Sequence, residues 1–243
     1  MITVSITEAN VFQALGQFLQ SVLPSGFAVM RGQVNRVAEP GVADFAVMWP
    51  ILRERLEYNV DSYADIAFVG SITATTLTVT QILQGKPAVG QLLGANGIAA
   101  NTTITAPLVV NSDGTGTYTV SVSQTLASET IQAGSKNLMQ PMKITMQVDV
   151  HGPNSADNSQ IISTVFRDET GVETFDASGF GVEPLYCDDP RQAPFVNGEQ
   201  QVEERWILTM AMQANPFVAI PQQFAGALKL NPVIAADEVY AAH

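Results

Sequence analysis

Cysteine and histidine are nearly absent from this sequence. It contains one cysteine, Cys187, and two histidines, His151 and His243. A single cysteine excludes an intrachain disulfide and a cysteine-rich zinc site. Asp149 and His151 lie two positions apart on an expected strand, but a protein metal site needs three or four ligands, so the simpler interpretation is a histidine at a strand end. The sequence therefore predicts no metal and no cofactor.

Charge is also scarce, and positive charge most of all. Charged residues make up 14% of the chain, with 11 Lys and Arg against 23 Asp and Glu, and the formal net charge is −12. Because binding to nucleic acid requires many cations to displace the counterions of phosphates, a general nucleic-acid binder is excluded. A negative wall would still let DNA pass along a channel without retaining it. The neutral polar residues that replace charge suit contacts between proteins.

Long apolar runs and catalytic motifs are missing as well. No run is long enough to span a bilayer, and the first residues lack the basic region of a signal peptide, so we expect no membrane contact and synthesis in the cytoplasm. The glycines after Asn111 lack the Lys-Ser or Lys-Thr pair of a phosphate-binding loop. Asp188 and Asp189 precede Pro190 and are interpreted as turn caps. The chain is predicted not to be an enzyme.

The N-terminal part predicts one helix followed by two strands. Apolar residues recur at every third or fourth position from Val11 to Leu23, which is typical of an amphipathic helix. Its start is a capping box over Ser5–Glu8, or alternatively a cap at Thr7. Strands are expected at Phe27–Val37 and Phe45–Tyr58.

The middle of the chain changes in composition. Residues 70–135 are rich in Thr, Val, Ala and Gly, and after Gly70 they contain only three charged residues, Lys86, Asp113 and Glu129. Short runs of alternating apolar and polar residues are separated by turn-forming stretches such as Asn111–Gly116. We interpret residues 70–135 as a small all-β domain inserted at an exposed loop, where the two ends of an insert lie close together.

The C-terminal part returns to the earlier pattern. Alternation over Met142–Val150 predicts a half-buried strand, and a second helix follows with an apolar face that ends at Phe166. Two more strands are expected at Phe180–Tyr186 and Glu203–Gln213, and the tail from Pro216 onward is expected to be mostly irregular. The fold class is thus α+β: a mixed, mainly antiparallel sheet with two helices on one face, formed by residues 1–69 and 136–243.

Two blocks of the sequence resemble a bacteriophage neck or tail-terminator family. The first block is Gln33–Pro40 followed by Phe45–Met48. The second is longer, and a helix segment ending at Phe166-Arg167-Asp168 also fits the family. The second block runs through Pro184–Gln201, Arg205-Trp206, Gln213–Pro216 and Pro221-Gln222. Residues 70–135 resemble instead a β-module of assorted phage structural proteins with no common chemistry, which suggests decoration of an outer surface.

The resemblance implies a structural virion protein of a tailed phage, assembled in the host cytoplasm. It implies a homo-oligomeric ring, usually of six copies, that caps the tail tube and joins it to the neck or connector of the head. The implied partners are the tail tube protein, the neck or connector proteins and the sheath of a contractile tail, with DNA passing through the lumen unbound. Two alternatives stay open: another head–tail connector or tail-completion protein, and a β-rich module that binds carbohydrate or a receptor.

Interface residues are expected in the two family blocks and the first strands. The cations there suit ion pairs between subunits, although exposed pairs contribute little stability, and the tryptophan suits a core or anchor position. We predict that Trp206→Ala disrupts folding or assembly. The candidate interface residues are Arg31, Arg36, Arg53, Arg55, Arg191, Glu199, Gln200 and Trp206.

Overall fold

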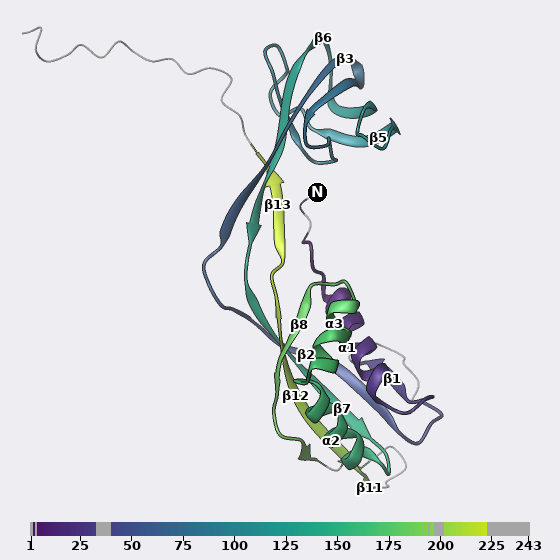
Figure 1. Cartoon of the computed structure of the whole chain (residues 1–243). Coiled ribbons are helices and arrows are strands. Elements are labelled where there is room, and N and C mark those ends of the chain that lie inside the picture. The colour runs from purple at the N-terminus through teal and green to yellow at the C-terminus, as the bar shows by residue number, and fades with distance from the viewer. Residues whose placement is uncertain (1, 3, 33–39, 194, 197–201, 223–243) are drawn as a thin grey trace, which may run out of the picture. The chain divides into compact units, whose positions relative to one another are not determined.

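The chain divides into two compact units. Figure 1 shows its computed structural model, which describes residues 2, 4–32, 40–193, 195–196 and 202–222. The α/β unit comprises Ile2–Ser62 and Asn137–Ala219, and the β unit comprises Tyr63–Lys136 together with residues 220–222 of the described chain. The chain leaves the α/β unit within strand β3 and returns to it within strand β6, so the two crossings lie inside regular structure.

The first helix, α1 (Glu8–Val22), begins at a capping box centred on Thr7. The Thr7 side chain accepts a hydrogen bond from the backbone N–H of Asn10 at 3.3 Å, and the Asn10 side chain accepts one from the backbone N–H of Thr7 at 2.8 Å. These bonds satisfy two amide groups that have no partner within the helix. The expected alternative of a cap at Thr7 is therefore confirmed in place of the box over Ser5–Glu8.

The α/β unit contains a six-stranded sheet with the order β1-β2-β7-β12-β8, and β9 also pairs with β12. The pair β1–β2 is parallel and the pairs that involve β7 and β12 are antiparallel. A mixed, mainly antiparallel sheet is therefore confirmed. The strands are β1 (Ala28–Arg31), β2 (Phe45–Arg55), β7 (Met142–His151), β8 (Val182–Cys187), β9 (Arg191–Gln192) and β12 (Arg205–Ala214).

Three helices of the described chain pack on one face of this sheet (Figure 1). They are α1, α2 (Ser155–Val165) and α3 (Glu169–Ala177). The sequence predicted two helices, and α3 corrects that number. With nine residues and one large buried side chain, Phe175, α3 shows no repeating apolar stripe. Its start could have been found from Asp168, whose side chain accepts the Thr170 N–H at 3.1 Å.

The core of the α/β unit lies between the helices and the sheet. Alternate residues of β7 and β12 face the helices because side chains alternate between the two faces of a strand. The buried members include Leu15, Phe18 and Leu19 of α1, Ile144, Met146, Val148 and Val150 of β7, and Leu208, Met210 and Met212 of β12.

The described elements of the β unit are strands. Its sheet has the order β13-β6-β3, and β4 and β5 also pair with β6. The sequence predicted only short strands here and a mostly irregular tail, whereas β6 extends over 24 residues and β13 lies in the tail. Because threonine occurs on both faces of these strands, the hydrophobic pattern does not show how long each strand is. The strands are β3 (Val60–Gln84), β4 (Leu92–Gly94), β5 (Ile104–Val110), β6 (Gly116–Met139) and β13 (Phe217–Pro221).

Two backbone features give the β unit its compact form. Strand β3 folds back on itself near Ala74, whose φ is 54°, and the Thr80 hydroxyl donates to the Val69 carbonyl at 3.2 Å. Gly116 begins β6 with a φ of 132°, and a Cβ there would lie 2.1 Å from the Val109 carbonyl oxygen. Only glycine allows the turn between β5 and β6 to close this tightly.

Candidate functional site

A buried carboxylate lies on the sheet face away from the helices. Asp149 of β7 is fully buried, opposite Ile207 of β12. Its Oδ1 accepts a hydrogen bond from Gln147 Nε2 at 2.7 Å, and its Oδ2 lies 3.5 Å from Arg205 Nη1. Burial raises the pKa of Asp149, while the bond from Gln147 and the charge of Arg205 act in the opposite direction. Arg205 Nε also donates to the Ala193 carbonyl at 2.9 Å, so the cluster fixes the chain beyond β9.

His151 closes the same end of the sheet. Its ring stacks on Phe45 of β2 with centroids 4.5 Å apart and planes at 7°. Its Nδ1 lies 3.9 Å from a carboxylate oxygen of Glu203. Burial lowers the pKa of His151, although the neighbouring Asp149 charge opposes the shift. The register places Phe45, His151 and Arg205 side by side, so the cluster joins three strands at one end. In the described part of the chain no three His, Cys, Asp or Glu side chains gather to hold a metal.

Arg31 at the end of β1 has partners within its own chain. Its guanidinium forms an ion pair with Glu8 of α1 and lies 4.3 Å from the centre of the Phe12 ring. These contacts tie β1 to α1. They engage the positive charge of Arg31, which we expected from the sequence to pair with a neighbouring subunit. Its proposed contact across an interface stays a prediction, and Arg36 lies outside the described residues.

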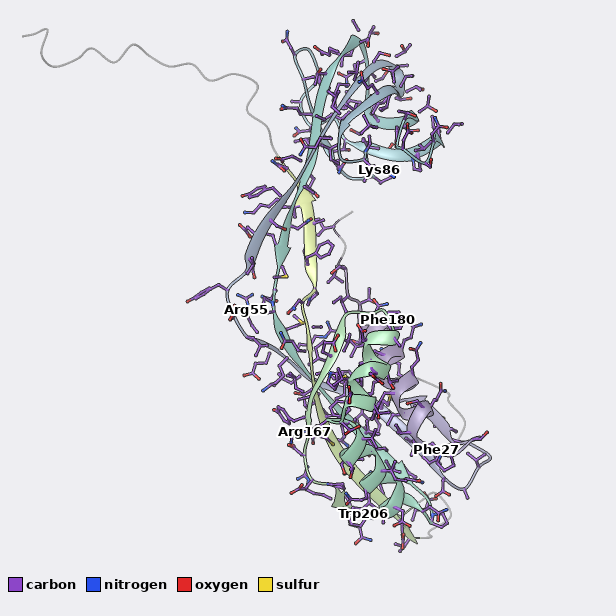
Figure 2. The ribbon with its side chains drawn as sticks, viewed as in Figure 1. Phe27, Arg55, Lys86, Arg167, Phe180 and Trp206 are labelled. Carbon is purple, nitrogen blue, oxygen red and sulfur yellow. The ribbon has the colours of Figure 1, made fainter. Side chains whose placement is uncertain are left out.

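Arg53 and Arg55 lie on the exposed second half of β2. They pair in register with Ile144 and Met142 of β7. Figure 2 shows Arg55 near the end of β2 and away from the three helices. Both arginine side chains are exposed, and the guanidinium of Arg55 faces the side-chain amide of Gln140.

The two C-terminal candidates in the described chain lie on neighbouring strands. Arg191 of β9 is exposed and pairs in register with Ile207 of β12. Trp206 is half-buried. In the sheet it pairs with Gln192 of β9 on one side and with Val150 of β7 on the other, and it lies on the face that carries the helices. Figure 2 labels Trp206 close to α2. Glu199 and Gln200 lie outside the described residues.

The single thiol and the two aspartates after it belong to a strand end. Cys187 Sγ donates to the Asp188 carbonyl at 3.3 Å, and burial raises the pKa of the thiol to about 12. The Asp188 N–H donates to the Thr209 carbonyl at 2.9 Å. Such a thiol is a poor nucleophile because it holds its proton at neutral pH.

An exposed segment of mixed apolar and charged residues is the feature that sequence reasoning missed. Every residue from Ile51 to Val60 is exposed, and Tyr58 is 91% exposed. A shallow hollow of about 590 Å³ is lined by Arg55–Val60. Apolar and charged residues are mixed here without a strict alternation, so the sequence pattern alone does not show that the whole segment is exposed. Five of these exposed residues are large hydrophobics, Ile51, Leu52, Leu56, Tyr58 and Val60, and exposed hydrophobic side chains that gather in one segment suit a contact with another protein.

The remaining observations come from the helices and from comparison with known proteins. No helix among the described residues combines the length and hydropathy of a membrane span. No curated protein matches the chain. A profile of a protein family described as phage neck terminator protein matches residues 102–233, which include β6, β7, β12 and β13. This match covers more than half of the chain, begins within the Thr-rich segment and includes the second sequence block, so the resemblance to a phage neck family is confirmed. The chain belongs to the phage neck terminator protein family.

Proposed function

We propose that copies of this protein form a ring that caps the tail tube and joins it to the neck or connector of the head. The observation that carries the proposal is the family match over residues 102–233. Membership makes the protein a structural component of the phage neck and hence of the virion. A cap needs one surface for the last ring of the tube and another for the connector, and neither surface needs catalytic groups.

The charge of the chain supports the ring. With a formal net charge of −12, a lumen built from several copies repels DNA and lets it pass without being retained. The exposed segment Ile51–Val60, with its five large hydrophobic side chains, supplies a surface for protein contact. The partners are other copies of the chain, six in the proposed ring, the tail tube protein, the connector proteins and, in a contractile tail, the sheath. Assembly takes place in the host cytoplasm.

We propose further that the β unit is an insertion, as the sequence predicts for residues 70–135. The chain enters and leaves it within β3 and β6, at Tyr63 and Lys136. Its near lack of charge suits a decoration that contacts other proteins rather than nucleic acid. Its removal, with residues 62 and 137 joined by a short linker, is expected to leave tube capping intact.

The test is the mass of the purified full chain in solution, measured by light scattering and followed by negative-stain images. The expected result is a ring of about six copies with an open centre, or a monomer that forms this ring on purified tail tubes. Tubes bound by the protein should stop growing when tube subunits are added. Binding to connectors without an effect on tubes would support a connector protein instead, and a monomer that ignores both would overturn the proposal.

A further inference from the structure

We propose that neighbouring copies join through the two free edges of the six-stranded sheet, with β2 of one copy against β8 of the next. The inference rests on the proposed ring and identifies the contact that builds it. Two observations carry it. Both edges expose apolar side chains, and the charges of the two edges have opposite sign.

The first edge is the outer half of β2. Strand β1 pairs with β2 only as far as Met48, whose carbonyl accepts the Gly32 N–H at 2.7 Å. Beyond this point the described residues place no strand on the outer side of β2. Ile51 and Leu52 are 55% and 54% exposed there, and the hollow lined by Arg55–Val60 follows directly. An unpaired edge with exposed apolar residues is a template for pairing with another chain.

The second edge is β8. It ends the sheet order on the other side, and within the described chain its one strand neighbour is β12. Leu185 and Tyr186 on this edge are 36% and 39% exposed. Among the described residues both ends of the same sheet are thus open, and each offers apolar side chains to a partner.

Charge distinguishes the two edges. Arg53 and Arg55 are exposed on β2, while Glu54 between them is already paired with Lys143 at 2.6 Å. The β8 edge carries three exposed carboxylates. Glu57 offsets part of the positive charge at β2, and the exposed Arg191 of β9 offsets part of the negative charge beside β8, but the difference in sign between the edges remains. The three carboxylates are Glu183, Asp188 and Asp189.

This charge pattern selects one mode of association. Pairing β2 with β2 would bring arginines together, and pairing β8 with β8 would bring carboxylates together, and like charges across a pair of strands destabilise it. Pairing β2 with β8 brings opposite charges together. Such a contact is heterologous, so each copy uses both edges and the assembly closes into a ring where the rotation between copies permits.

A proline in each edge limits how far the backbones can pair. Pro50 lies in β2 and Pro184 in β8, and neither has an N–H to donate. Proline on an edge strand interrupts the ladder that an added strand would form, and it protects against uncontrolled aggregation. The contact therefore depends on side chains, and this makes the charges decisive for its strength.

The test reverses the charge of each edge in turn. The first variant is R53E/R55E and the second is E183R/D188R/D189R, both in the full chain. Each variant alone has two edges of like sign. Because like charges placed across an interface lower the affinity by more than one factor of ten, we expect self-association at least about tenfold weaker than that of the wild type. The 1:1 mixture has complementary edges at every contact and should regain rings in which the two variants alternate. Light scattering gives the mass, and native mass spectrometry gives the ratio of the two variants.

Arg167→Glu is the matched control, because Arg167 is exposed between α2 and α3 and belongs to neither edge strand. It should assemble like the wild type, and circular dichroism must show all variants folded. Rings formed by R53E/R55E alone, or a mixture of folded variants that does not assemble, would overturn the edge contact and leave the proposed function standing. A wild type that forms no ring even on tail tubes would overturn both.

Discussion

The two units of the chain build their cores in different ways. In the α/β unit, three aromatic rings from three helical segments meet, and the centroids of Phe18, Phe166 and Phe175 lie 5.4 to 5.7 Å apart. In the β unit the core is mostly aliphatic, with Phe68 as its fully buried ring. Tyr118 is buried there too, but its hydroxyl donates to the Gly114 carbonyl at 2.7 Å and so fixes a turn.

Their charges differ as strongly as their cores. Residues 71–135 contain three charged side chains, and one of them, Lys86, donates to the Ser112 carbonyl at 2.6 Å. The described part of the α/β unit holds a buried carboxylate, a buried histidine, exposed arginines on β2 and exposed carboxylates on and just after β8. From this difference we expect selectivity that depends on charge to lie in the α/β unit, since charge complementarity gives specificity to protein contacts.

The largest expected loss of stability comes from removing a buried aromatic ring from each core in turn. Phe175→Ala should lower the free energy of unfolding by about 3–5 kcal/mol, because it leaves a cavity among the three rings. Phe68→Ala should do the same to the β unit. Urea denaturation measures the loss, and amide hydrogen exchange shows which unit loses protection.

Val172→Ala is the control for Phe175→Ala, since Val172 lies on the same helix and is 43% exposed. Its effect should stay within about 0.5 kcal/mol. If either phenylalanine variant exposed both units equally to exchange, the units would unfold as one and the comparison between them would fail.

A smaller effect is expected from the turn of the β unit. Gly116→Ala should cost about 1–3 kcal/mol, because the residue has a positive φ and its new methyl group would meet the Val109 carbonyl. Gly90→Ala has a positive φ as well but no atom within 4 Å of the added Cβ, so it isolates the backbone strain. Thermal unfolding of both variants gives the difference. Equal losses would show that the close contact contributes nothing.

The capping box of α1 is expected to contribute about 1 kcal/mol to the α/β unit. Thr7→Ala removes the acceptor for the Asn10 N–H, and urea denaturation should report a loss of that size. Thr7→Ser keeps the hydroxyl and should retain most of the stability. A serine variant as unstable as the alanine variant would assign the effect to the lost methyl group instead.

The pH dependence of stability should also differ between the units. The folded-state pKa of His151 is lowered by burial, so folding favours the neutral ring, and stability is lost as the pH falls below 6.5 toward the lowered pKa. The β-unit segment Tyr63–Lys136 contains no histidine and should keep its stability in this window. Protonation of Asp149, whose pKa is raised, acts in the opposite direction at lower pH. His151→Gln should flatten the profile between pH 5 and 7, and an unchanged slope would assign it to other groups.

The elements that could be predicted from the sequence are those whose apolar residues recur with one regular spacing, either that of a helix or that of a strand. The stripe from Val11 to Leu23 gave α1, and strict alternation over Met142–Val150 gave β7, because each has one covered face. Helix α3 was missed because one buried side chain makes no period. The length of β6 was missed because its core residues are separated by threonine and serine rather than by charge.

The candidate site was only partly accessible from the sequence. Arg53 and Arg55 were identified from their place near the first strands, and both are exposed. The burial of Asp149 depends on its register with Arg205 and Gln147, and a single strand carries no information on register. The exposure of Ile51–Val60 depends on where the neighbouring strand β1 ends, which is likewise a property of the assembled sheet.

The raised pKa of Cys187 has a practical consequence for following assembly with chemical probes. At neutral pH almost none of this thiol is ionised, and maleimide dyes react with the thiolate. A cysteine introduced at an exposed position outside the proposed contact, such as Ala156 of α2, can therefore be labelled selectively without removing the native one. Energy transfer between dyes on different copies would then report subunit exchange in real time, in a protein of otherwise unaltered sequence.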